Sequence, residues 1–271
     1  MDHLLDHFLE NGWIVLDLLN PLPVIEAREG LQGQLNALLQ KNVPLEEYHN
    51  IAEQDAFHTD IQVKMTQFFR EQKYAREILK GQKQFFKELL GRDLLIQANP
   101  YLRMTRPFKK QDNIGYHRDT FYGGSPYEVS VLVPFVDLKA ESSLKVMSKS
   151  HYFSESLFPT FKVENEDKQV TKGSAKHQLG FLYAPKLMDP AIEEQMQAVP
   201  LKMGQALLFS LATVHGSVEN RGDITRWSSD MRVLNALAPV DLSARPDYYE
   251  TLCLSPVTAS VKKYEQANRE A

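Results

Sequence analysis

Apolar residues recur at helical spacing over the first third of the chain and form short runs after it. The helical spacing predicts a short helix over residues 4–9 and longer helices over about 23–40, from about 55, and over about 74–90, with a strand over 13–16. Gly91 follows the last of these helices, in a position where glycine commonly ends one. Apolar and β-branched runs then predict strands over residues 94–104, 129–136, 144–147, 207–214 and 226–234.

Helices that precede strands along the chain predict an α+β fold, with the helices buttressing an antiparallel double sheet. The chain has no internal repeat or low-complexity linker, so we expect one domain over residues 1–271. It would comprise a helical buttress (about 1–91), a sheet core (about 92–238) and a tail (239–271) with a last solvent-facing helix over about 259–268. Residues 152–198 fit neither pattern, and a stretch of this kind is often a lid or binding loop.

Composition excludes several classes of protein. The chain has 31 basic and 35 acidic residues, a net charge of −4, and no basic tail, which argues against a nucleic-acid binder. Its one cysteine, Cys253, rules out an internal disulfide framework and fits a reducing compartment. No apolar run approaches the length of about 18 residues that a membrane span needs. We therefore expect a cytoplasmic protein without a membrane or nucleic-acid partner.

Candidate chemistry begins with His117 and Asp119, two residues apart. On an extended segment this spacing puts both side chains on one side of the backbone. A distant histidine, His215, can complete a set of two imidazoles and one carboxylate that leaves metal positions open. Such a set suits non-haem Fe(II) that must also bind a cosubstrate and O2. Taken alone, the His-x-Asp pair fits a charged surface loop equally well.

A second motif follows His215 by eleven residues. Arg226 and Ser228 alternate, so on a strand they share a face. A guanidinium offers a rigid donor fork to a carboxylate, and a hydroxyl two residues away can add a further hydrogen bond. The pair is therefore a candidate clamp for a carboxylate ligand.

In this order, His-x-Asp, His and Arg-x-Ser resemble the Fe(II)/2-oxoglutarate-dependent oxygenases, and most of all the phytanoyl-CoA hydroxylase-like group. The resemblance covers roughly residues 8–238 and includes the segments 8–16, 143–151 and 204–209. One departure is Ser148-Lys149, where relatives usually have Pro-Gly. It affects a turn and not the metal motif.

The resemblance implies a double-stranded β-helix, a jelly roll of cupin type. It also implies that His117, Asp119 and His215 hold Fe(II), while 2-oxoglutarate chelates the metal and meets Arg226 and Ser228 with its far carboxylate. O2 would take the remaining position. A small-molecule substrate would be hydroxylated, with release of succinate and CO2. Halogenating relatives have a small residue in place of the carboxylate, so Asp119 disfavours halogenation.

Other polar residues are open to two interpretations. Ser130 and Ser217 lie where related enzymes contact 2-oxoglutarate, or they are ordinary strand hydroxyls; Asn99 is a weaker candidate of the same kind. Arg232 shares the strand face of Arg226 and could reach cosubstrate or substrate, or form a buried ion pair.

The substrate is indicated only by local charge. Between residues 101 and 118 one acid, Asp112, stands against five basic residues: Arg103, Arg106, Lys109, Lys110 and Arg118. An anionic or sugar-containing substrate that contacts Arg103 and Arg118 is one interpretation, and a solvated cationic loop is the other. Tyr122 would line the mouth of the predicted barrel and contact the substrate, or it would simply pack there.

Two rival functions come from other classes. A β-helix that had lost its chemistry would serve as a binding or scaffold protein, but that role gives no reason for the complete motif set. A metal-dependent cupin isomerase or hydrolase would not need the carboxylate clamp at Arg226.

Overall fold

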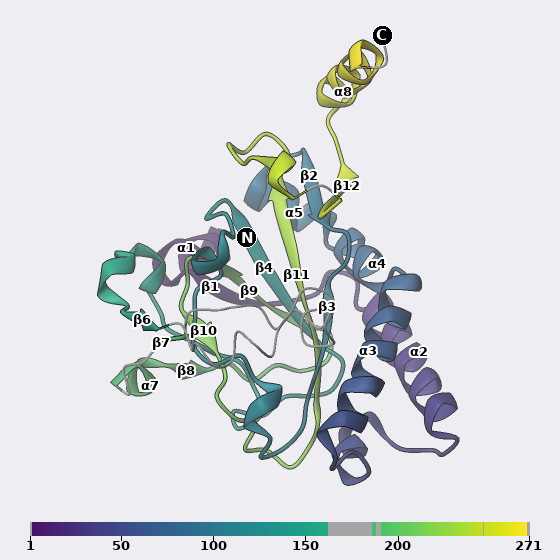
Figure 1. Ribbon diagram of the computed structural model, residues 1–271. Coiled ribbons are helices and arrows are strands. Elements are labelled where there is room, and N and C mark those ends of the chain that lie inside the picture. The colour runs from purple at the N-terminus through teal and green to yellow at the C-terminus, as the bar shows by residue number, and fades with distance from the viewer. Residues whose placement is uncertain (1, 162–185, 188–190, 246, 270–271) are drawn as a thin grey trace.

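The computed structural model describes residues 2–161, 186–187, 191–245 and 247–269 (Figure 1). Its first part is helical, as the spacing predicts, and a single strand, β1 (Trp13–Asp17), crosses into the sheet. The helices of this part are α1 (Asp2–Asn11), α2 (Leu22–Leu39), η1 (Leu45–Asn50), α3 (Asp55–Glu71), α4 (Tyr74–Gly81) and α5 (Lys83–Leu90).

The one helix predicted over about 74–90 is wrong in detail, because it divides into α4 and α5 at Gln82. The side chain of Gln82 is buried and holds the loop before α2 through two hydrogen bonds. It accepts from the backbone N–H of Leu19 at 2.6 Å and donates to the carbonyl of Asn20 at 3.1 Å. The break between α4 and α5 therefore lies at the residue whose buried amide binds this loop.

All strand pairs of the large sheet are antiparallel, and their order is β1-β9-β4-β11-β2-β12, with β3 also paired to β11. The bounds are β2 (Leu94–Gln97), β3 (Tyr101–Thr105), β4 (Glu128–Pro134), β9 (Gln205–Ser210), β11 (Arg226–Asn235) and β12 (Tyr249–Cys253). A small sheet has the order β10-β5-β8, formed by β5 (Lys145–Val146), β8 (Gln197–Ala198) and β10 (His215–Gly216). The predicted mixture of helices and antiparallel sheet is confirmed.

The helices α2, α3, α4 and α5 pack on one face of the large sheet (Figure 1). On β11, Trp227, Met231 and Val233 are buried in this shared core, which also holds Leu31 of α2 and Phe69 of α3. Successive side chains of a strand point to opposite faces. The even-numbered residues of β11, from 226 to 232, therefore face away from the helices. They line a cavity on that face of the sheet.

Two strand predictions differ from the structure. The run over 94–104 divides into β2 and β3, and the run over 207–214 ends with β9, so that His215 belongs to the other sheet. The strand β12 was not predicted. The remaining short elements include η2 (Lys110–Asp112), η3 (Asp119–Tyr122), η4 (Ser150–Tyr152), η5 (Glu155–Leu157), β6 (Thr160–Phe161), β7 (Lys186–Leu187), α7 (Ala191–Gln195) and η7 (Leu242–Ala244).

The predicted C-terminal helix is confirmed as α8 (Pro256–Arg269), which projects from the body with most of its residues exposed (Figure 1). The predicted lid over residues 152–198 lies largely outside the described residues. None of the helices in the described ranges combines the length and the apolar character that a membrane crossing requires.

Candidate metal centre

Backbone pairing brings the two distant histidines together. His117 and His215 form an antiparallel bridge, in which each N–H donates to the other's carbonyl at 2.9 Å. Gly216 has a φ of +145°, and a Cβ there would lie 2.1 Å from the carbonyl oxygen of Gly115. Only glycine permits this close approach. As a result the two imidazole rings lie with their centroids 4.4 Å apart.

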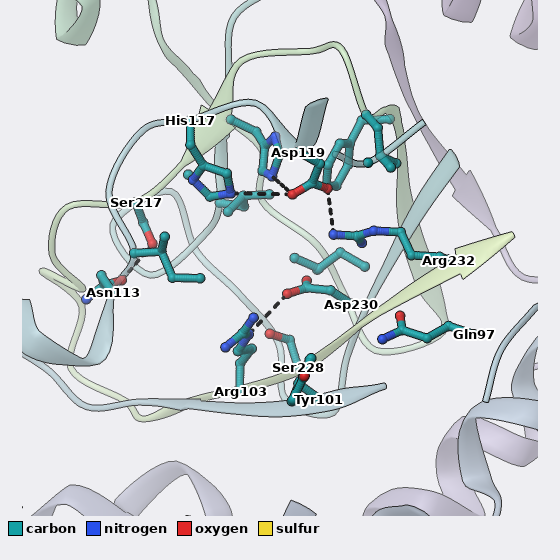
Figure 2. Close-up of a pocket in the computed structure, with 18 of the residues that line it drawn as sticks. Gln97, Tyr101, Arg103, Asn113, His117, Asp119, Ser217, Ser228, Asp230 and Arg232 are labelled. Atoms are coloured by element: carbon teal, nitrogen blue, oxygen red, sulfur yellow. Dashed lines mark hydrogen bonds and ion pairs between the residues drawn. The ribbon is translucent and has the colours of Figure 1, made fainter. Parts of the chain in front are cut away.

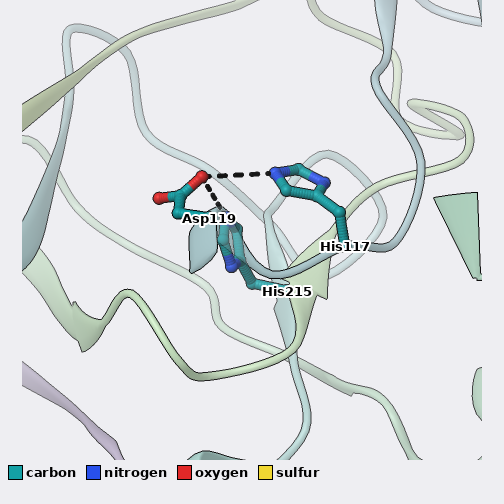
Figure 3. A group of neighbouring side chains, drawn as sticks. All are labelled: His117, Asp119 and His215. Atoms are coloured by element: carbon teal, nitrogen blue, oxygen red, sulfur yellow. Dashed lines mark ion pairs between the residues drawn. The ribbon is translucent and has the colours of Figure 1, made fainter. Parts of the chain in front are cut away.

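Asp119 joins them from the start of η3. The intervening Arg118 has extended backbone angles, φ −114° and ψ 144°, so residues 117 and 119 point to the same side, as predicted. Oδ1 of Asp119 is 3.6 Å from Nε2 of His117 and 3.9 Å from Nε2 of His215. One ligand atom from each residue lies within 4.8 Å of the others, and all three side chains are buried (Figure 3).

The histidines present the correct nitrogen for a cation. Nδ1 of His117 lies 2.9 Å from the carbonyl of Gly115, and Nδ1 of His215 lies 2.9 Å from that of Thr213. A neutral ring that donates from Nδ1 to a carbonyl carries its lone pair on Nε2, the atom that can bind a metal. Burial and the neighbouring His117 ring also lower the pKa of His215 to about 4, so this ring is neutral at pH 7. The donor set fits a divalent transition metal with open positions.

Arg232 on β11 forms an ion pair, as one of its two interpretations expected, and its side chain is 15% exposed. Its Nη2 donates to Oδ2 of Asp119 at 2.5 Å, and its Nη1 donates to the hydroxyl of Ser130. Burial alone would raise the pKa of Asp119, but Arg232 and His215 outweigh it and hold that pKa well below its usual range. The carboxylate is therefore ionised and ready to bind a cation.

Arg226 differs because no carboxylate among the described residues forms an ion pair with it, although Asp230 and Asp112 lie close enough to offset part of the effect of burial on its pKa. Its Nη atoms donate to the hydroxyls of Thr105 at 3.1 Å and Ser217 at 3.3 Å, and to the carbonyl of Ser142 at 3.3 Å. Its Nε and the Ser228 hydroxyl are buried without a hydrogen-bond partner among the described residues. Burial lowers the pKa of Arg226 to about 10, so it remains a cation at pH 7. A buried, uncompensated cation next to a spare hydroxyl fits an anionic ligand.

One cavity of about 380 Å³ joins the metal centre to Arg226, and residues of both sheets line it (Figure 2). Its size is at the lower end of the range for small-molecule sites. Of the residues predicted from sequence, the cavity brings together His117, Asp119, His215, Arg226, Ser228, Ser217, Arg103 and Arg232. The remaining candidates, Ser130, Arg118 and Asn99, are not among its lining residues. Tyr122 lies in η3, with its side chain outside the described set.

A sequence model for the family Phytanoyl-CoA dioxygenase (PhyH) matches residues 26–228, about three quarters of the chain. The chain belongs to the phytanoyl-CoA dioxygenase family. Membership places it among oxygenase-type enzymes and confirms the resemblance drawn from the motifs. Among curated proteins, no sequence matches the chain.

Solved structures support the same fold at low sequence identity. The apo structure of the non-haem monooxygenase ThoJ has 18% identity and a TM-score of 0.58, covering 93% of this chain and 84% of that one. EvdO2 from Micromonospora carbonacea var. aurantiaca, complexed with 2-oxoglutarate, has 15% identity and a TM-score of 0.50, covering 91% and 95%. EctD from S. alaskensis, with 2-oxoglutarate and 5-hydroxyectoine, has 14% identity and a TM-score of 0.52, covering 89% and 78%.

In this member of the phytanoyl-CoA dioxygenase family, the basic residues between 101 and 118 do not form a common patch. Arg106 is buried and binds both oxygens of Asp112 at 2.8 Å. Arg118 donates to the carbonyls of Ser150 and Phe153, away from the cavity lining. Of the five, only Arg103 lines the cavity, and it pairs with Asp230 at 3.3 Å.

Sequence reasoning missed several polar residues of the site, among them Thr105, which supports Arg226 from outside the cavity lining, and the lining residues Asn113 and Asp230. Thr105 supports Arg226 from β3, its direct partner in the strand register. Asn113 accepts from the hydroxyl of Ser217 at 2.6 Å. Asp230 pairs with Arg103. It lies four residues after Arg226 on the same strand face, and this alternation could have identified it from sequence.

Proposed function

We propose that this phytanoyl-CoA dioxygenase family member is an Fe(II)- and 2-oxoglutarate-dependent dioxygenase. It hydroxylates a small polar metabolite, with release of succinate and CO2. The observation that carries the proposal is the uncompensated Arg226 beside the spare Ser228 hydroxyl, in one cavity with a complete His-Asp-His set. A scaffold protein has no use for this arrangement, and a cupin isomerase or hydrolase has no use for its anion site.

The residues fit the two groups that the proposal requires. His117, Asp119 and His215 would hold the iron, and Arg226 with Ser228 and Ser217 would hold the distal carboxylate of 2-oxoglutarate. Bound iron together with 2-oxoglutarate and O2 supplies an oxidant strong enough to hydroxylate a C–H bond. Support from relatives comes from EvdO2 and EctD, whose structures hold 2-oxoglutarate.

The protein's own part is to orient these groups and to keep water out. Apolar side chains line the cavity that joins the metal centre to Arg226: Leu132 of β4, Phe209 of β9, and Leu144 and Leu211 beside the strands. Charge interactions are stronger where water is excluded. Arg226 on a strand in the interior of the sheet presents a fixed fork, which suits a carboxylate better than a flexible ammonium would.

The charges in the cavity favour a substrate without a strong negative charge. Arg103 is already paired with Asp230, and Arg232 with Asp119. Arg226 is assigned to the cosubstrate. Arg245 also lines the cavity, where it donates to the carbonyl of Gly123 at 2.6 Å. Beside these arginines the wall offers neutral hydrogen-bonding side chains, Gln97 and Tyr101 among them (Figure 2). Of the two substrate classes suggested by the sequence, a hydroxylated, sugar-like metabolite fits this wall better than an anion.

We also infer that the large and small sheets are the two halves of a double-stranded β-helix. The support is that β10 of the small sheet supplies His215 while β11 of the large sheet supplies Arg226 to one cavity. The antiparallel pairing throughout both sheets is consistent with a jelly roll.

Anaerobic addition of Fe(II) and then 2-oxoglutarate tests the function. The chelate should give a visible charge-transfer band, and admission of O2 with a panel of neutral and anionic metabolites should yield succinate. Arg226→Ala should raise the apparent 2-oxoglutarate constant at least tenfold, because a charge-assisted hydrogen bond contributes about 1.5–3 kcal/mol. No band with the wild-type protein, or an unchanged constant in Arg226→Ala, would contradict the proposal.

A further inference from the structure

The carboxylate of Asp119 presents its two oxygens to different partners. Oδ1 is the oxygen close to Nε2 of both His117 and His215. Oδ2 accepts a hydrogen bond from Nη2 of Arg232 at 2.5 Å (Figure 2). The oxygen that faces the imidazoles and the oxygen that meets the guanidinium are therefore separate atoms.

Arg232 is itself held from a second strand. Its Nη1 donates to the hydroxyl of Ser130, which lies directly opposite it in the pairing of β11 with β4. Ser130 is fully buried, and both strands lie in the interior of the large sheet. A planar guanidinium with both amino groups hydrogen-bonded has a fixed orientation. The sheet therefore determines where Oδ2 of Asp119 lies.

We propose that Arg232, oriented by Ser130, is a positioning residue that restricts Asp119 to binding the metal through Oδ1 alone. This inference rests on the proposed function. A carboxylate binds a cation through one oxygen or through both, and a second oxygen would fill a coordination position. By retaining Oδ2, Arg232 keeps that position open for cosubstrate or O2, which a two-histidine, one-carboxylate site needs.

The proposal gives Ser130 and Arg232 a different role from the cosubstrate and substrate contacts expected from sequence. Ser130 is not among the residues that line the cavity, and both amino groups of Arg232 are engaged by protein atoms. Residues that hydrogen-bond to metal ligands typically change metal affinity by about 10- to 100-fold when they are replaced. That magnitude sets the expectation for the test.

Metal affinity measured without turnover is the first readout. Ni(II), which does not react with O2, is titrated by calorimetry into the metal-free full-length protein. We expect Arg232→Gln to weaken Ni(II) binding by about 10- to 100-fold. Arg232→Lys should recover part of the loss, because an ammonium can pair with Oδ2 but does not reproduce the planar two-armed fork.

A double-mutant cycle tests the part played by Ser130. Ser130→Ala should weaken Ni(II) binding by less than Arg232→Gln does, and it should add nothing in the Arg232→Gln background. The hydroxyl acts only through the guanidinium, so the two effects should not be additive. The matched control is Arg103→Gln, which removes a cavity arginine that pairs with Asp230 instead of a triad residue; its Ni(II) affinity should equal that of the wild type.

The visible absorption of Co(II)-loaded protein gives a second readout, since its intensity and position report the coordination number. Release of Oδ2 in Arg232→Gln should change this spectrum, and Arg232→Lys should restore it in part. Where Arg232→Gln does not fold, the Lys variant carries the same comparison. Wild-type affinity and spectrum in the Arg232 variants would overturn this proposal alone. A wild-type protein that binds no Ni(II) would overturn the proposed function with it.

Discussion

Replacing Arg226 with Met separates ligand binding from stability. In the absence of ligand, burial lowers the pKa of Arg226 from 12.5 to about 10. This corresponds to a cost of about 3 kcal/mol for keeping the cation at neutral pH. The cation recovers most of that cost through hydrogen bonds to Thr105, Ser217 and the carbonyl of Ser142, each worth about 1 kcal/mol. The two contributions nearly cancel.

Arg226→Met should therefore leave the free energy of unfolding of the ligand-free protein within about 1–2 kcal/mol of the wild type. For a chain of this size the melting temperature would move by no more than about 8 °C. The stabilisation by ligand should disappear. With Ni(II) present and 2-oxoglutarate at about 100 times its Kd, the wild type should gain about 2.7 kcal/mol, or roughly 5–10 °C.

Arg106→Met is the matched control, because Arg106 is as deeply buried as Arg226 but is compensated. It binds both oxygens of Asp112 at 2.8 Å and also Asp55 at 2.8 Å. Its loss removes the cation that pairs with the buried Asp112 and leaves that carboxylate only the backbone N–H of residue 106 and the nearby His58 ring. Breaking a buried ion pair in this way should cost about 3–5 kcal/mol. Thermal melts followed by circular dichroism, with and without 2-oxoglutarate, compare the two variants. An Arg226→Met protein as unstable as Arg106→Met, or one still stabilised by 2-oxoglutarate, would refute the reasoning.

Four further outcomes can be checked. Alanine at His117, Asp119 or His215 should abolish Fe(II)-dependent succinate formation while circular dichroism shows a folded protein. Ser228→Ala should raise the 2-oxoglutarate constant by less than the arginine variant, because one hydroxyl contributes about 1 kcal/mol. Substrate-dependent kcat/KM should not change with ionic strength, whereas a steep fall would indicate an anionic substrate after all. Burial lowers the pKa of His58 from 6.5 in the unfolded chain to about 4 in the folded protein, so the unfolded chain takes up this proton at higher pH. The free energy of unfolding should therefore fall by about 3 kcal/mol as the pH drops from 6.5 to 4. The fall should be smaller in His58→Phe, which has no group that titrates there.

Amphipathic helices and strands could be predicted from sequence, because the spacing of their apolar residues shows which side of the element is buried. Both α2 and α3 follow the apolar spacing, and β11 follows the alternation that puts Arg226 and Ser228 on one face. The apolar run over 207–214 has no such spacing. Leu207 and Val214 are both buried, but they belong to different clusters on either side of a turn, in which Thr213 donates to Ser210. A continuous apolar run does not say where the chain changes sheets.

Local charge counts failed for a related reason. The excess of basic residues between 101 and 118 suggested an anion-binding segment. Whether a cation can bind an anion depends on the acidic residues that contact it in the fold, and these can be distant in sequence. Arg106 finds Asp55, 51 residues away, and Arg103 finds Asp230, 127 residues away. These pairs form only when α3 and β11 meet β3, so the sequence shows the cations but not which of them remain uncompensated.

The two arginines of β11 differ in this respect, although they share a strand. Arg226 and Arg232 are six residues apart on one face of that strand, and both line the same cavity. Asp119 raises the pKa of Arg232 against the effect of burial, while burial without such a partner lowers that of Arg226. The two identical side chains therefore differ in charge compensation, because the 3₁₀ turn η3 brings the Asp119 carboxylate to Arg232 and not to Arg226. The compensated arginine can fix a metal ligand, and the uncompensated one can bind an anion and release it again.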